Sequence, residues 1–253
     1  METSAQFAIR LEGLTKSFGA QRVLDGVDLS VREGETMTVL GQSGVGKSVM
    51  LKLIIGLEEP DSGNIEIDGV LLSSLSPDEL NRIRKTIGFL FQNAALYDSL
   101  SVEENVAFPL RRHRKMSEAD MRDRVGELLA RVGIERARKK MPADISGGMA
   151  KRVGLARALA LDPAIILLDE PTSGLDPITA AEVDDLVREL QKERKISSVV
   201  VTHDMNCVKT IADHVAMIDR GRIVADGTLD DIKHSDNPFV KRFLRESGEV
   251  CDV

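Results

Sequence analysis

A glycine-rich segment between an apolar strand and a helical pattern constrains this chain more than any other feature. The segment follows the pattern G-x-x-x-x-G-K-[ST], with an apolar run at 36–40 before it and helically spaced apolar residues at 49–55 after it. Its glycines let successive backbone N–H groups turn towards one anion, and the helix adds its positive end. The pattern therefore predicts binding of a nucleoside triphosphate by the eight residues Gly41, Gln42, Ser43, Gly44, Val45, Gly46, Lys47 and Ser48.

Side chains that suit phosphate chemistry accompany this loop. Lys47 can reach the β- and γ-phosphates, and the Ser48 hydroxyl can ligate Mg²⁺. The apolar strand 165–168 then delivers Asp169, which helps to hold Mg²⁺, and Glu170, which can activate water as a general base. An acidic strand end before a proline is the simpler reading of this pair. The phosphate loop in the same chain favours the catalytic one.

A second glycine turn opens another helix. Ser146, Gly147 and Gly148 precede an amphipathic stretch, and the N-terminus of a helix is an anion site. Alone, this tripeptide is equally explained as a loop before a helix. Because the phosphate loop already holds the triphosphate, a second anion-binding helix end suggests a nucleotide contacted from two sides.

Bulk properties exclude several classes of protein. The formal net charge of −7 argues against wholesale nucleic-acid binding, so we expect no nucleic-acid partner. Cys207 and Cys251 give no disulfide framework, and residues 1–6 are polar, unlike a signal peptide. The longest apolar run, 164–168, falls short of the roughly 20 residues that span a bilayer. We therefore expect an intracellular chain that is not embedded in a membrane.

Hydrophobic patterns alternate between strands and helices along the chain. Helices between continuously apolar strands predict an α/β fold with a parallel sheet, and residues 101–161 predict a helical insert in which Ser117 is an N-cap. Strands are expected at 7–11, 27–31, 36–40, 65–69, 87–91, 165–168, 198–201 and in a pair within 215–225, and a helix at 178–193.

Six motifs in order carry a family resemblance that covers about Phe7 to Phe243. They are the phosphate loop, Gln92, Ser146 to Gly148, Asp169 with Glu170, Ser173 to Asp176, and His203. This order resembles the nucleotide-binding subunit of ABC transporters. The resemblance implies a P-loop NTPase core (about 7–92 and 163–235) with an N-terminal antiparallel β portion, an inserted α-helical subdomain (about 93–162) and a short C-terminal helix or tail (236–253), all within one domain, 7–253.

The same resemblance implies cofactors, a partner and residue roles. Two ATP molecules with Mg²⁺ would lie in a head-to-tail homodimer, each between Lys47 of one copy and residues 146–148 of the other. Gln92 would ligate Mg²⁺ and join the attacking water to the transporter contact, and His203 would hydrogen-bond the γ-phosphate. Asp176 would lie in the dimer-facing loop, and Phe18 would stack on adenine.

Taken alone, two of these residues have simpler explanations. A single histidine such as His203 is more often a solvated or core residue, and Phe18 is more often a packing residue. His203 directly follows the apolar run 199–201, and ligands bind at the carboxyl ends of strands in open α/β sheets. That position supports a functional role for His203 without the family.

Within the family, the chain looks like the Mla-type subgroup of phospholipid transporters. Met149 replaces the glutamine that many members carry, and residues 91–100 and 104–110 also look like that subgroup. This implies a role at the cytoplasmic face of the inner membrane with an MlaE-like permease docking near 94–109, a STAS-domain protein and an MCE-type lipid-binding protein. Burial within the helical insert would equally explain the apolar residues near 94–109. The basic run 111–115 is either a solvated face or a contact for anionic headgroups.

Two other functions share these motifs. A soluble ABC-type ATPase of DNA repair, chromosome maintenance or translation would usually carry coiled-coil or zinc inserts or a second nucleotide domain, and none is visible. A nucleotide sensor without turnover is the other alternative, and the presence of Glu170 argues against it.

Overall fold

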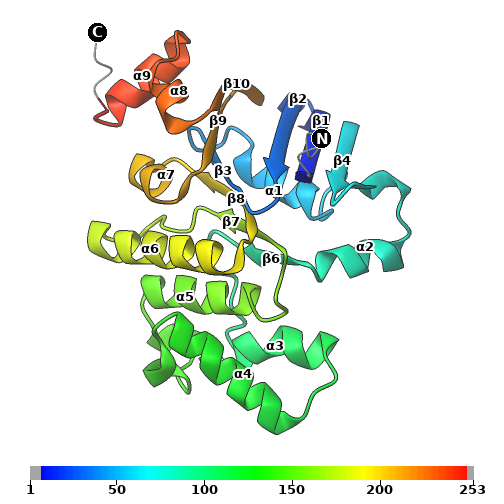
Figure 1. Cartoon of the computed structure of the whole chain (residues 1–253), viewed down its shortest axis with the longest axis vertical. Coiled ribbons are helices and arrows are strands. Elements are labelled where there is room, and N and C mark those ends of the chain that lie inside the picture. Colours follow the sequence, from blue (N-terminus) through cyan, green and yellow to red (C-terminus); the bar gives the residue numbers. More distant parts are fainter. Residues whose placement is uncertain (1–6, 250–253) are drawn as a thin grey trace, which may run out of the picture.

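Two β-sheets form the upper part of the molecule (Figure 1). The computed structural model describes residues 7–249, so residues 1–6 and 250–253, including Cys251, lie outside the description. The smaller sheet is antiparallel, in the order β2-β1-β4-β5. Its strands are β1 (Phe7–Phe18), β2 (Gln21–Arg32), β4 (Ser62–Ile67) and β5 (Val70–Leu71).

The larger sheet has the order β10-β9-β3-β8-β7-β6 and is mostly parallel. Only the pairing of β9 with β10 is antiparallel among the described strands of this sheet. Three of its inner strands, β3, β8 and β7, are buried along their whole length, as a sheet covered on both faces requires. The strands are β3 (Thr36–Leu40), β6 (Ile87–Leu90), β7 (Ile165–Asp169), β8 (Ser197–Thr202), β9 (His214–Asp219) and β10 (Arg222–Gly227).

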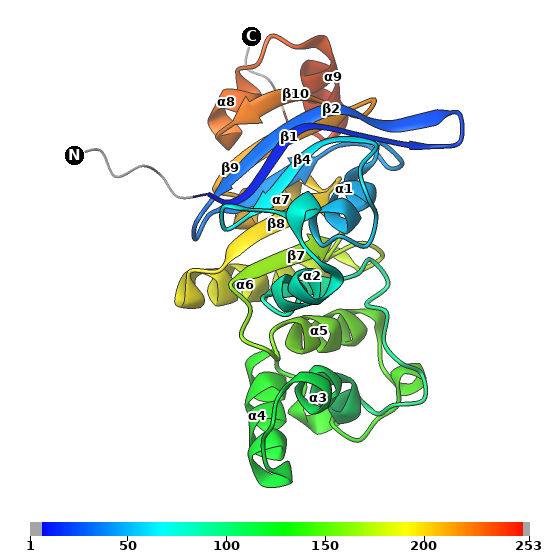
Figure 2. The same ribbon diagram turned by 90° about the vertical axis from the view of Figure 1, so that its right-hand side faces the viewer.

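Three helices, α3, α4 and α5, lie together at the end of the molecule away from the antiparallel sheet (Figures 1 and 2), and we call them the helical layer. They are α3 (Val102–His113), α4 (Glu118–Arg131) and α5 (Gly147–Ala158). Serine side chains cap α3 and α4, and the predicted N-cap Ser117 is confirmed because its side chain accepts a hydrogen bond from the Asp120 amide.

The remaining helices flank the sheets or follow them. α1 (Lys47–Ile54) begins at the end of the glycine loop, two residues earlier than the apolar pattern suggested. The others are α2 (Pro77–Arg84), α6 (Pro177–Arg194), α7 (Met205–Ile211), α8 (Leu229–Lys233) and α9 (Pro238–Glu246), with short 3-10 turns at Leu72–Ser74, Glu135–Ala137 and Pro142–Asp144. Within residues 7–249, no helix combines the length and the apolar character that crossing a bilayer requires.

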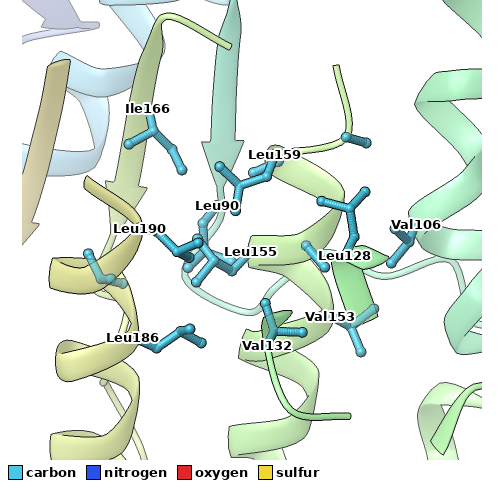
Figure 3. Packing of buried hydrophobic residues seen from close by; sticks show 14 of the residues in the cluster. Leu90, Val106, Leu128, Val132, Val153, Leu155, Leu159, Ile166, Leu186 and Leu190 are labelled. Atoms are coloured by element: carbon cyan, nitrogen blue, oxygen red, sulfur yellow. The ribbon is translucent and has the colours of Figure 1, made fainter. Parts of the chain in front are cut away.

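The buried apolar residues fall into separate clusters. One joins α1 to both sheets, so the helix that starts at the glycine loop is held between two layers. A second joins the helical layer and α6 to β6 and β7, and Figure 3 shows Leu155 of α5 beside Leu90 of β6 and Leu190 of α6. A third lies under α8 and α9. The predicted α/β fold with a mostly parallel sheet and an antiparallel N-terminal portion is confirmed.

Candidate nucleotide-binding site

The glycine loop leaves the carboxyl end of the fully buried strand β3 and curves into α1. Gly44 and Gly46 have φ angles of +83° and +107°, which side-chain-bearing residues rarely adopt. A Cβ on Gly46 would lie only 2.8 Å from Leu24 Cδ2. The loop encloses a cavity of about 320 Å³ whose lining residues are Val23, Ser43, Gly44, Gly46, Lys47, Ser48, Val49, Gln92 and Glu170.

Lys47 is almost completely buried at this cavity, with 4% of its surface exposed. Its ammonium donates to the carbonyls of Gly41 at 2.6 Å and Gln42 at 3.0 Å, and it lies 3.3 Å from Glu170 Oε1. Burial lowers the pKa of Lys47, while the nearby carboxylate of Glu170 opposes that effect. The structure therefore holds a cation where an incoming phosphate would meet it.

Ser48 and Asp169 lie together beside the same cavity. The Ser48 hydroxyl donates to Asp169 Oδ1 at 2.8 Å, and Gln92 lines the cavity nearby. Burial raises the pKa of Asp169, and the hydrogen bond from Ser48 opposes this rise. Mg²⁺ prefers oxygen ligands and is usually bound by one or two carboxylates together with substrate phosphates. A hydroxyl, a carboxylate and an amide oxygen at the cavity fit that ion.

Glu170 joins the two sides of the site. It follows β7, its backbone N–H donates to the Val201 carbonyl at 2.9 Å, and its φ angle is +48°. One carboxylate oxygen faces Lys47, and the other lies 2.8 Å from His203 Nδ1. The sequence predicted Glu170, Lys47 and His203 as site residues, and the structure brings all three together. A carboxylate at the cavity wall is placed to take a proton from water.

Other predicted residues lie outside the cavity lining described for residues 7–249. The Ser146 hydroxyl accepts from the Met149 amide of its own helix, and a Cβ on Gly148 would lie 2.4 Å from Thr179 Cγ2. Asp176 caps α6 by accepting from the amides of Ile178 and Thr179. The hydrogen bond from the Thr179 hydroxyl lowers the pKa of the Asp176 carboxyl most, and the bonds from these amides lower it further. Gly147 opens α5 directly after Ser146.

Phe18 ends β1 and is 46% exposed. The Lys16 ammonium lies 5.2 Å from the centre of its ring. The ring is therefore accessible to a stacking partner, although it does not line the cavity in this structure.

Sequence reasoning missed two residues of the site. Val23, in β2, lines the cavity beside Gly46, and nothing in its strand pattern distinguishes it. Lys151 is buried in α5, and its ammonium donates to the backbone carbonyls of Gln92 and Glu170. Burial lowers the pKa of Lys151 to about 8. The available signal was that the residues three and four positions from Lys151 in the helix are small or apolar, namely Gly147, Gly148, Gly154 and Leu155.

Comparisons with known proteins agree with this geometry. Residues 24–173 match the family described as ABC transporter. The chain is 46% identical over 237 residues to the probable ribonucleotide transport ATP-binding protein mkl of Mycobacterium tuberculosis. This alignment covers 94% of this chain and 66% of that protein. It is 41% identical to the methionine import ATP-binding protein MetN 1 of Pseudomonas putida, over 90% of this chain and 68% of that protein.

A solved structure supports the same assignment. The ATP-binding cassette MJ0796, described as a dimeric post-hydrolysis state bound to ADP and Pi, superposes with a TM-score of 0.81. The two sequences are 36% identical over 87% of this chain and 98% of that one. This chain belongs to the ABC transporter family, and it is an ABC ATPase domain with ATP and Mg²⁺ as its cofactors.

Proposed function

We propose that this chain is the ATP-hydrolysing subunit of a membrane ABC transporter, and that two copies close around two ATP molecules to drive a permease. One observation carries the proposal: Lys47, Glu170 and His203 form a connected group at the phosphate-loop cavity. This arrangement supplies both a phosphate contact and a general base, so it supports turnover as well as binding.

The residues have distinct tasks in this reaction. Lys47 exchanges Glu170 for the γ-phosphate, and the loop amides hold the other phosphate oxygens. Ser48, Asp169 and Gln92 would hold Mg²⁺, which neutralises charge on the transferred phosphoryl group. Glu170 then orients water and accepts its proton, while His203 contacts the γ-phosphate. The products are ADP and phosphate.

A second copy completes the site in this proposal. Ser146, Gly147 and Gly148 begin a helix but do not line the cavity of their own copy, so they are free to contact a nucleotide held by another. Asp176 begins α6 beside them, and Phe18 remains accessible for adenine. The test is the ATPase rate per copy over a range of protein concentrations. We expect it to fall on dilution, and a constant rate in strictly monomeric protein would refute the dimeric site.

We further propose that residues 93–162 form a subdomain and that the permease docks near 94–109. A groove of about 1260 Å³ lies between α2, β6, α3 and α5. The rings of Tyr97 and Phe108 pack 4.7 Å apart at this groove and remain 46% and 41% exposed, as expected for a partner surface. Phe108→Ala should weaken assembly with the permease and leave the ATPase rate of the isolated chain unchanged. Leu57→Ala, which removes an exposed apolar side chain elsewhere, is the control.

Glycerophospholipid is the cargo we propose, with the chain held peripherally at the cytoplasmic face of the inner membrane by an MlaE-like permease. The Mla-like segments around Met149 and near 94–109 support this cargo. A STAS-domain protein and an MCE-type lipid-binding protein are the accessory partners expected with it. The relatives are named for ribonucleotide and methionine transport, so the purified transporter should be tested with all three cargoes. Movement of labelled phospholipid supports the proposal, and ATP-driven movement of only a ribonucleotide or methionine refutes it.

A further inference from the structure

Helix α5 is fastened to the segment that contains Gln92 by three contacts along one of its faces. The Lys151 ammonium donates to the Gln92 carbonyl. One turn later, Gly154 lets α5 pack closely against Leu90 and Ala94, since a Cβ on Gly154 would lie 2.6 Å from Leu90 Cδ1 and 3.3 Å from Ala94 Cβ. The Arg157 guanidinium then donates to the carbonyls of Ala94 and Ala95 at 2.6 and 2.7 Å. The helix and the segment 90–95 therefore form one packed unit.

Lys151 differs from the other two contacts because it also reaches the sheet. Its ammonium donates to the Glu170 carbonyl at 2.7 Å and lies 3.5 Å from the Ser173 hydroxyl. With the Gln92 carbonyl, these acceptors match the three donors of an ammonium. The residue is 5% exposed, so the three contacts are made with almost no competition from water.

The two carbonyls belong to residues that line the same cavity. Gln92 and Glu170 both line it, yet they come from different elements, after β6 and after β7. Glu170 also has a positive φ angle of 48°, a backbone conformation that its surroundings must hold in place. A single cation bound to both carbonyls fixes the spacing of the two backbones.

We propose that Lys151 is a positioning residue for ATP hydrolysis, which sets the Gln92 amide and the Glu170 carboxylate in register with the γ-phosphate and links both to the helix that begins at Ser146. The inference rests on the roles proposed for Gln92 and Glu170. Lys151 does not line the cavity, so it acts through those two residues and contacts neither the nucleotide nor the attacking water.

The two bonds have unequal consequences when they are lost. The Glu170 carbonyl keeps a second donor, because the Ser173 hydroxyl also donates to it at 3.0 Å. Within the described part of the chain, Lys151 is the only side-chain donor to the Gln92 carbonyl. We therefore expect removal of the ammonium to displace the Gln92 segment without unfolding the chain.

The test replaces Lys151 with methionine, which keeps much of its length but has no donor, and with glutamine, which keeps N–H donors. For Lys151→Met we expect kcat to fall about 10- to 100-fold, because small misplacements of reacting groups cause losses of this size. The KM for ATP should stay within about threefold of the parental value. Lys151→Gln should recover part of that loss. Arg152→Met is the matched control, because it removes a neighbouring cation that binds the Val132 carbonyl and Glu182 instead.

Titration with a fluorescent ATP analogue gives the fraction of binding-competent protein for each variant. The inference is overturned if Lys151→Met has the parental kcat, or if its loss of kcat is fully explained by a smaller binding-competent fraction. An equal loss of kcat in Arg152→Met would overturn it as well. Glu170→Gln in the same assay distinguishes failure of the proposed function from failure of this inference. The activity of Glu170→Gln tests the general base, whereas the difference in kcat between Lys151→Met and Lys151→Gln tests the role of Lys151.

Discussion

Replacing Glu170 with glutamine tests the centre of the proposed mechanism, because it separates two tasks of one carboxylate. In this structure the carboxylate lies 3.3 Å from the Lys47 ammonium and 2.8 Å from His203 Nδ1. An incoming γ-phosphate must take over Lys47 and lie near that carboxylate. The variant Glu170→Gln should therefore lose hydrolysis and, at the same time, bind ATP more tightly.

The size of both effects follows from the geometry. With an effective dielectric constant of about 20, two unit charges 3.3 Å apart attract by about 5 kcal/mol before desolvation is counted. The net value of a hydrogen bond to a charged group is about 1.5–3 kcal/mol. Freeing Lys47 from this partner should thus tighten ATP binding about 10- to 100-fold. Losing a positioned general base should lower kcat about 10²- to 10⁴-fold.

Binding and turnover are measured separately, by titration with a fluorescent nucleotide and by phosphate release. ADP serves as an internal control, since it lacks the γ-phosphate and its affinity should change much less. Glu182→Gln is the matched variant, because it removes the same charge from an exposed carboxylate that pairs with Arg152. It should leave both measurements unchanged.

Two results would refute the reasoning in different ways. Phosphate release by Glu170→Gln at the parental rate would remove the general-base assignment. Equal ATP affinity in the parent and the variant would show that the Lys47–Glu170 contact does not compete with the nucleotide, even if hydrolysis is lost.

Two further predictions concern the loop and a buried acid. Gly46→Ala would place a Cβ 2.8 Å from Leu24 Cδ2 at a φ angle of +107°, so we expect at least about a tenfold loss of ATP affinity with the fold retained by circular dichroism. Asp184 is 2% exposed and burial raises its pKa to about 6, so the native state keeps a proton that the unfolded chain releases above pH 4. The contribution of Asp184 to the free energy of unfolding, measured as the difference between the parent and Asp184→Asn, should therefore increase as the pH falls from about 7 to 4. Raising the pKa from 3.8 to about 6 corresponds to at most about 3 kcal/mol, which Asp184→Asn should recover at pH 8; equal denaturation midpoints at that pH would contradict the assignment.

Much of the fold could be predicted because the residue pattern of each strand or helix agrees with the burial that its place in the fold requires. The strand at 165–168 is apolar at every position, and burial on both faces of a parallel sheet favours that pattern. The strand at 36–40 is also buried at every position, although it contains Thr36 and Thr38. The helix α2 was not predicted, because its residues are mostly polar and none is buried. Its signals were Ser76 and Glu79, which form a capping box, with Pro77 at the first helical position.

The site was predictable where a motif carries its own backbone geometry. The glycine loop needs positive φ angles, and the sequence shows that need directly as Gly44 and Gly46. The contacts of Lys151 could not be predicted, because they depend on carbonyls 59 and 19 residues away in sequence. The sequence shows only a lysine whose neighbours three and four positions away in the helix are small or apolar, and it does not show which carbonyls the lysine contacts. Their partners emerge from the packing of α5 against β6 and β7.

The contact between Lys47 and Glu170 also gives the site an order of events. A buried ammonium without partners would be unstable, and here two loop carbonyls and the carboxylate satisfy it. Lys47 and His203 each contact one oxygen of this carboxylate, so an attacking water must compete with them for it. In the proposed mechanism, the γ-phosphate displaces the carboxylate from Lys47. The proposed mechanism therefore predicts that the triphosphate, unlike the diphosphate, releases Glu170 to act as the general base.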